Sequence, residues 1–174
     1  MESYVTLEEA NAYMDGRLDS AAWECVDDHT RRKALVEATR RIDMQRWRGR
    51  KKDSDQEHAF PRCFWEPHRR CPEKMVISTD DRLGPGWWCE SEVSQAVKDA
   101  TCEEALAILR AAQDPAGEMR RRLQEQGVTS ISMSRSSETY AKEIVLAKSA
   151  GQGLMSPVAK QLLMVYELGS AGVV

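Results

Sequence analysis

Four segments of this chain combine a helix start signal with an apolar stripe of helical period, which favours a mainly α fold. The start signals are a capping box at Thr6 and Glu9, an acidic N-terminus at Asp27 or Asp28, a serine N-cap at Ser94, and a serine N-cap followed by proline at Ser156 and Pro157. The helices behind them are expected from Leu7 to Met14, from about Asp28 through Ile42, from Gln95 to Ala112, and from Pro157 to a stop at Gly169. We therefore expect a small helical bundle.

The stripes identify the core that these helices should share. In the second helix the apolar positions are Ala34, Leu35, Ala38 and Ile42. In the third they are Val97, Thr101, Ala105, Ile108 and Ala112, with Leu109 beside them, and in the last they are Val158, Leu162, Val165 and Tyr166. The third helix is the longest of the four, and we expect it to be central.

The segment from Gly49 to Val93 shows no helical period and holds four of the six prolines. It predicts a long irregular loop, and loops of that length are usually functional or flexible. Further along, a shorter helix is expected from Glu118 to Gln126, ended by Gly127. The near-alternating residues Val128 to Met133 predict a short β arm or hairpin that could pair with another chain.

Composition excludes several classes of protein. The 174 residues are 41% apolar and 30% charged, with a mean hydropathy of −0.58, which is typical of a soluble globular domain. No apolar run approaches the roughly 18 to 20 residues of a membrane-spanning helix, and the first residues lack the pattern of a signal peptide. We expect one domain over residues 1–174, made in a reducing cytoplasm, with five scattered cysteines that form no disulfide framework.

Charge is distributed unevenly along the chain. Between Arg31 and Lys52 lie ten basic and two acidic residues, a net +8 in a chain whose formal net charge is −3. Clustered Lys and Arg attract polyanions and release counterions on binding, so the segment predicts contact with DNA or an acidic partner. The alternative is a solvated helix face that runs into a basic loop. The residues selected for that contact are Arg46, Arg48, Arg50, Lys51 and Lys52.

Catalytic and metal-binding signals are weak. A zinc site would need four residues of suitable type, and the candidates are Cys63, His68, Cys71 and Cys89. Their spacing contains no C-x2-C pair, so free reduced thiols are the favoured interpretation, with no metal and no cofactor. None of the common phosphate-binding, nucleophile or zinc-hydrolase motifs occurs, which favours a protein that is not an enzyme. Trp87 and Trp88 could line a groove for nucleic acid, but anchoring in the core or loop is favoured.

Whole phrases of the sequence resemble a phage protein family. They are SYVTLEEANAYMDGRL with Ala22 and Trp23, KALVEATRRID, the loop pattern G-x6-Q-x4-P-R at Gly49, Gln56, Pro61 and Arg62, VSQAVKDATCEEALAIL, RRRLQEQGVTSISMSRSSETY and LMSPVAKQLLMVYELGS. That family has been labelled DnaT-like single-stranded-DNA-binding, and it is similar to the head-to-tail connector, or adaptor, proteins of long-tailed phages. The resemblance covers nearly the whole chain except residues 63–91, which are expected to be a loop insertion.

The resemblance implies a structural virion protein of the phage neck, a head-completion adaptor without enzymatic activity or membrane contact. The chain would form a homo-oligomeric ring, dodecameric in such adaptors, that docks on the portal protein, contacts a tail or stopper protein, and lets DNA pass without sequence specificity. The portal contact is assigned to the C-terminal segment, which includes the tail 170–174; the alternative is a frayed terminus. The residues selected for the portal contact are Gly169, Ser170, Ala171, Gly172, Val173 and Val174. The second hypothesis is a replication accessory that binds single-stranded DNA through residues 31–52.

Overall fold

The computed structural model describes residues 2–65, 75–77, 86–114, 116–117, 119, 123, 126, 130–133, 136–139 and 153–167. Their fold is mainly α, as predicted. The helices are α1 (Leu7–Asp15), α2 (Ala21–Glu24), α3 (Asp28–Asp43), α4 (Gln95–Gln113) and α7 (Pro157–Leu163), which continues into the 3-10 helix η1 (Met164–Tyr166). In the described part of the chain, no helix has the length and apolar character that a membrane crossing requires.

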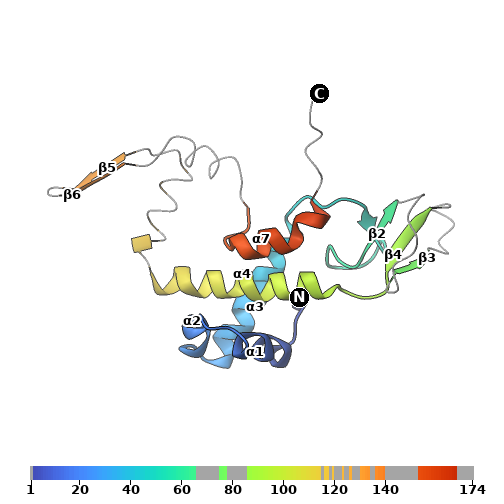
Figure 1. Ribbon diagram of the computed structural model, residues 1–174, viewed down its shortest axis with the longest axis horizontal. Helices are drawn as coiled ribbons and strands as arrows, with labels where there is room; N and C mark the ends of the chain where they lie inside the picture. The colour runs from blue at the N-terminus through green and yellow to red at the C-terminus, as the bar shows by residue number, and fades with distance from the viewer. Residues whose placement is uncertain are drawn as a thin grey trace.

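Helix α4 is the centre of the helical part of the molecule (Figure 1). Helices α1, α2, α3 and α7 all pack against it, so that α1 and α2 lie on one side and α7 on the other (Figure 1). Val97, Ala105 and Leu106 of α4 are fully buried. The expected bundle with a central third helix is therefore confirmed.

The capping signals mark the helix starts correctly. The Thr6 hydroxyl accepts from the Glu9 amide, and the Glu9 carboxylate accepts from the Thr6 amide, which completes the capping box. Asp27 and Ser156 accept in the same way from amides three residues further along, at the starts of α3 and α7. These bonds are local, which explains why the sequence alone was sufficient to find them.

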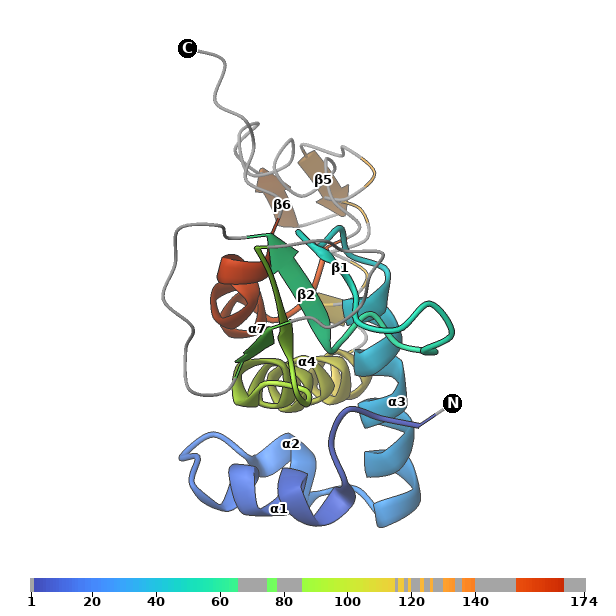
Figure 2. The ribbon, with the colours of Figure 1, turned by 90° about the vertical axis from the view of Figure 1, so that its right-hand side faces the viewer.

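The predicted irregular loop is wrong for the described part of residues 49–93, which contains an antiparallel sheet (Figure 2). The sheet has the order β1-β2-β4-β3, and its strands are β1 (Arg50–Lys51), β2 (Arg62–Trp65), β3 (Met75–Ile77) and β4 (Trp87–Glu90). Each strand has only two to four residues. Strands so short carry almost no period, and their pairing joins residues far apart in the sequence, so periodicity could not reveal them. Within residues 63–91, which were expected to be a loop insertion, the described residues contribute β3, β4 and most of β2 to this sheet.

The turn between β1 and β2 is held by the residues of the loop pattern. The Arg62 guanidinium donates to the carbonyl oxygens of Trp47, Arg48, Gly49 and Ala59 at 2.8–3.3 Å. The Gln56 amide nitrogen donates to the carbonyl oxygens of His58 and Pro61. Gly49 has φ +77°, and a Cβ there would lie 2.2 Å from the Cys63 carbonyl oxygen, so only glycine fits. The residues of the loop pattern therefore determine the conformation of the turn between β1 and β2.

The predicted inward face of the last helix is confirmed only in part, because Leu162 and Tyr166 pack against the core and are partly buried. Ala159 and Leu163 are the buried residues of α7, whereas Val158 and Val165 are 42% and 63% exposed. Glu104 of α4 accepts from the amides of Met155 and Ser156 at 2.9 Å, which sets the rotation of the helix. The α-helix also ends at Leu163, before the predicted stop at Gly169, which lies outside the described residues.

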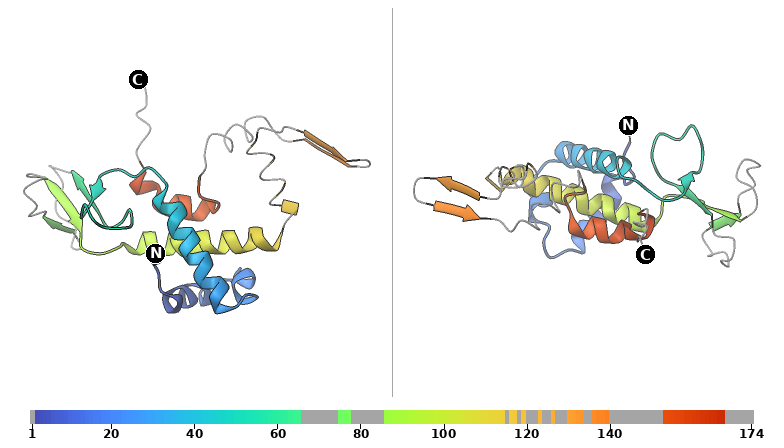
Figure 3. Two further views of the ribbon diagram at one scale, coloured as in Figure 1. Left: turned by 180° about the vertical axis from the view of Figure 1, so that it is seen from behind. Right: turned by 90° about the horizontal axis from the view of Figure 1, so that it is seen from above.

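The predicted strand near residue 130 is confirmed as one half of a hairpin. Strand β5 (Ser130–Met133) pairs antiparallel with β6 (Ser136–Thr139) of the same chain. The hairpin lies beyond the end of α4 that is opposite the four-stranded sheet (Figures 1 and 3). The helix predicted from Glu118 to Gln126 falls almost wholly outside the described residues, as does the tail.

Candidate nucleic-acid interface

Strand register places aromatic and basic residues on one face of the four-stranded sheet. Arg50 of β1 is opposite Cys63 of β2, Cys63 is opposite Cys89 of β4, and Trp65 is opposite Trp87. Directly opposed residues share a face, and so do residues two positions apart on one strand. Arg50, Cys63, Trp65, Trp87 and Cys89 therefore share one face, which we call the tryptophan face.

The other face of the sheet packs against the helical body. Phe64 is 4% exposed, and its ring centroid lies 5.8 Å from that of Tyr166 in η1. The buried Glu90 carboxylate accepts from the Tyr166 hydroxyl at 2.7 Å and from the Arg62 amide at 3.0 Å. Because burial disfavours its charged form, the pKa of Glu90 is raised. These contacts fix the orientation of the sheet and leave the tryptophan face directed away from α7.

Two of the cysteines expected to be free thiols form a disulfide. Cys63 and Cys89 are bonded between β2 and β4, and both are buried. Their bond corrects the expectation of reduced thiols, because antiparallel pairing brings residues 26 positions apart into direct contact. Among the described residues no group of three or more potential ligands could hold a metal ion. His68 and Cys71 lie outside the described residues.

The two tryptophans of this face differ in their surroundings. The Trp65 side chain is 61% exposed, which is unusual for so large an apolar group. Next to it, the Arg50 guanidinium carbon lies 5.3 Å from the centroid of the half-buried Trp87 ring, within the range of a cation–π interaction. An exposed indole beside an indole covered by a cation offers a planar apolar surface together with positive charge.

Of the five predicted basic contact residues, the structure brings Arg50 to the tryptophan face and distributes the others around β1. Arg46 is exposed just before the strand. The half-buried Arg48 guanidinium lies over the Phe64 ring at 5.2 Å, on the packed side of the sheet. Lys51 Nζ donates to the carbonyl oxygens of Gln56 and Glu57, and Lys52 Nζ donates to that of Ser91. The two lysines therefore also hold the loop in place.

A second polar cluster, centred on Asp43 at the end of α3, has a structural role. Its carboxylate accepts from the Tyr4 hydroxyl and, at 2.9 Å, from the Ala59 amide, and it lies 2.9 Å from His58 Nδ1. Burial, followed by the bond to Asp43, raises the pKa of Tyr4. The cluster joins the N-terminal segment to the loop between β1 and β2, and each of its groups has a partner within the fold.

Trp65 is the site residue that sequence reasoning missed. The signal was present as a mirrored order, Cys63-Phe64-Trp65 followed later by Trp87-Trp88-Cys89. Antiparallel pairing brings two such segments together with cysteine opposite cysteine and tryptophan opposite tryptophan, as the register confirms. The tail selected for portal contact, Gly169 to Val174, lies outside the described residues.

Comparison with known protein families gives a match over the N-terminal part of the chain. Residues 1–80 match a family described as "Putative DnaT-like ssDNA binding protein", and the matched range includes α1, α2, α3, β1, β2 and β3. No curated protein and no solved structure matched the chain.

The match corrects the expectation of a structural head-to-tail connector, which was wrong. It supports the DnaT-like label and gives no support to a virion role or to portal and tail partners. The physical reason lies in what the resembling phrases encode. Thr6 caps α1, while Gly49, Gln56 and Arg62 hold the loop, so these residues specify local structure and carry no information about assembly.

Proposed function

We propose that this chain binds single-stranded DNA across the tryptophan face, as a replication accessory without catalytic activity. The observation that carries the proposal is the exposed Trp65 ring opposite Trp87, with the Arg50 guanidinium over the Trp87 ring. Proteins that bind single strands without sequence preference combine aromatic side chains, on which bases stack, with a basic surface that follows the phosphates.

The aromatic half of this chemistry suits a single strand and not a duplex. Bases in a duplex are already stacked on their neighbours, whereas an unpaired base has both faces available to an indole ring. Trp65 presents such a ring to solvent. Because every base has a π face, we expect binding with little sequence preference.

The electrostatic half comes from the basic segment. Arg46, Arg50 and Lys51 are exposed on or beside β1, and β1 is an edge strand of the sheet. A strand with a base stacked on Trp65 would therefore meet positive charge where it crosses the β1 edge of the sheet. The chain as a whole is acidic, so this local concentration of positive charge gives the strand a preferred place to bind.

The family match supports the same function. The matched residues 1–80 include β1, β2 and Trp65, while Trp87 and Cys89 lie beyond them. The family description names single-stranded DNA as the ligand, and the matched part of this chain contains the basic segment and the more exposed tryptophan.

The decisive experiment is fluorescence anisotropy with a labelled 16-nucleotide oligothymidylate, comparing the wild type with Trp65→Ala. Loss of one stacked base is worth about 1–3 kcal/mol, so we expect the affinity to fall by about 5- to 150-fold. Leu18→Ala is the matched control, because Leu18 is a fully exposed apolar residue between α1 and α2, away from the sheet. Equal affinity of the two variants, or no binding by the wild type at 50 mM salt, would contradict the proposal.

A further inference from the structure

Helix α3 carries a second basic surface, away from the sheet. A shallow depression of about 470 Å³ lies on its outer side, and the residues that line it are His29, Arg32, Lys33, Val36, Glu37 and Arg40. Their spacing of three and four residues puts them on one side of the helix. The stripe buried against α4 and α1 occupies the other side, through Ala34, Leu35, Ala38 and Ile42.

This α3 surface has an excess of positive charge. Arg32, Lys33 and Arg40 are exposed, and Glu37 is the acidic residue among the six that line the depression. The Glu37 carboxylate lies 3.3 Å from Arg41 Nε and 3.9 Å from Arg40 Nη1, so its charge is shared with a further arginine. The surface therefore attracts anions. Exposed charges within about 10 Å of one another act together at ordinary salt concentrations.

The α3 surface and the tryptophan face are connected. The chain passes from the end of α3 at Asp43 through Arg46 to β1, the edge strand of the sheet. Figures 2 and 3 show α3 on the same side of the molecule as β1, leading toward the sheet. An extended polyanion that crosses the edge of the sheet at β1 would thus meet α3 next.

We propose that a single strand bound at the tryptophan face continues over β1 onto α3, where Arg32, Lys33 and Arg40 contact its phosphates. This inference rests on the proposed function and adds the path of the strand. The 16 residues of α3 span about 24 Å, enough for about seven nucleotides at the 3.4 Å rise of a duplex strand and fewer in an extended one. Bases are held at the sheet and backbone alone at the helix.

Such a path predicts that the contribution of α3 depends on oligonucleotide length. A strand of about four nucleotides, at the short end of known site sizes, can occupy the tryptophan face alone, while one of about 16 nucleotides also covers α3. Neutralising a residue on α3 should therefore weaken binding of the long strand and leave binding of the short strand unchanged.

The test compares Lys33→Ala with Lys160→Ala, using labelled oligothymidylates of 4 and 16 nucleotides at salt concentrations from 50 to 200 mM. Lys160 is an exposed lysine on α7, so both substitutions remove the same charge from an exposed helix position. For Lys33→Ala with the long strand, we expect several-fold weaker binding and a salt dependence shallower by about 0.7 in log–log slope. Lys160→Ala should match the wild type with both strands.

The possible outcomes distinguish failure of the path over α3 from failure of the proposed DNA binding itself. If Lys33→Ala and Lys160→Ala bind the 16-nucleotide strand equally, or if Lys33→Ala weakens both strands to the same extent, the path over α3 is wrong although the tryptophan face still binds. If the wild type binds neither strand, the proposed function itself fails. A circular dichroism spectrum equal to that of the wild type confirms that Lys33→Ala is folded.

Discussion

Arg62 illustrates how an arginine can serve the fold alone. Its guanidinium is buried and bonded to four carbonyl oxygens of the chain around the β1–β2 turn. Arg50, twelve positions earlier, lies instead over an indole ring on the tryptophan face. The sequence presents both as arginines in a segment without helical period, and only burial and hydrogen-bond partners distinguish the structural residue from the candidate ligand-binding one.

Cysteine reactivity can be predicted at this scale. Burial raises the pKa of the Cys102 thiol to about 12, whereas Cys25 is exposed. Because the thiolate is the nucleophile, iodoacetamide at pH 8 should modify Cys25 within minutes and leave Cys102 unmodified until the protein unfolds. Peptide mass spectrometry with and without urea measures this. Equal labelling of both cysteines in the folded protein would be inconsistent with a buried Cys102.

The same thiol contributes to the pH dependence of stability. A folded pKa above the unfolded value of about 8.5 means that the unfolded state releases the proton first. The contribution is therefore complete below pH 8 and decreases as the pH rises toward 12. Cys102→Ala should remove this part of the alkaline loss of stability, as urea titrations at pH 7 and pH 10 would detect.

At the scale of elements, a buried carboxylate on one helix determines how another is docked. Glu104 of α4 is completely buried, and its carboxylate accepts hydrogen bonds from two backbone amides at the start of α7. Its Oε1 also lies 3.4 Å from Nη1 of Arg41 in α3. A stripe of apolar residues indicates that a helix has a buried side, but an interaction with another element can rotate that side. The apolar stripe predicts that Val158 and Val165 face the core, but both are exposed because the contacts of Glu104 rotate the helix.

Glu104→Gln tests this role. The amide replaces one accepting oxygen with a donor that faces a backbone amide, so we expect the free energy of unfolding to fall by about 1.5–3 kcal/mol. Glu92→Gln is the control, because Glu92 is an exposed glutamate just before α4. Urea denaturation measures both. A Glu104→Gln variant as stable as Glu92→Gln would show that the carboxylate does not anchor α7.

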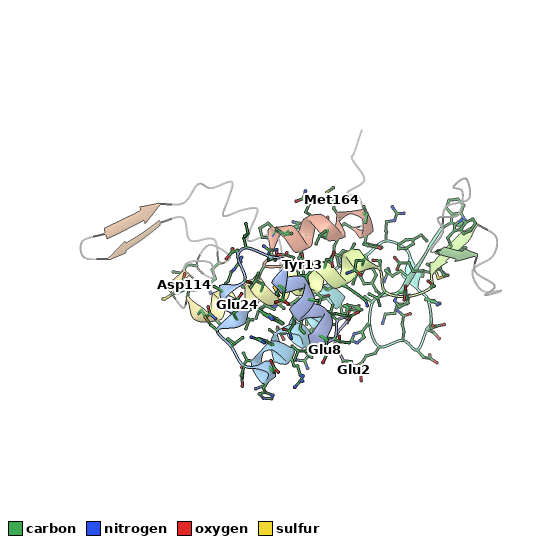
Figure 4. All side chains as sticks on the ribbon, turned by 60° about the horizontal axis from the view of Figure 1, so that its bottom comes forward. Glu2, Glu8, Tyr13, Glu24, Asp114 and Met164 are labelled. Atoms are coloured by element: carbon green, nitrogen blue, oxygen red, sulfur yellow. A yellow bond between two sulfur atoms is a disulfide. The ribbon has the colours of Figure 1, made fainter. Side chains whose placement is uncertain are left out.

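At the scale of the molecule, the helical body and the sheet are built on different principles. The body has a core of packed helices in which Met14, Leu35, Ile42, Leu106 and Leu163 are almost inaccessible to solvent. The hydroxyl of Tyr13 of α1, labelled in Figure 4, donates to Glu103 of α4 at 2.7 Å. The sheet has short strands, the Cys63–Cys89 bond, and one face against Tyr166. It should therefore depend on the disulfide more than the body does.

Reduction of the Cys63–Cys89 disulfide should lower the stability of the sheet more than that of the helical body. Closing a loop of this length stabilises the fold by about 3–4 kcal/mol, and that contribution is concentrated in the sheet. We expect dithiothreitol to leave the helical circular dichroism signal nearly unchanged while weakening binding of single-stranded DNA, since Trp65 and Trp87 lose their fixed pairing. Unchanged DNA affinity after complete reduction would show that the disulfide does not support the tryptophan face.

Local signals in the sequence were sufficient for the helices, and they were insufficient for the sheet. The N-cap side chains accept hydrogen bonds from amides three residues further along, as at Thr6, Asp27 and Ser156. The apolar stripe from Ala34 to Ile42 likewise lies within one helix. The caps and the stripe can therefore be identified without knowing the rest of the fold. The Cys63–Cys89 bond joins two strands across 26 positions, and the tryptophan face is assembled from those strands and β1. Strands of two to four residues carry too little pattern to identify their partners, so those contacts depended on how the folded chain brings distant segments together.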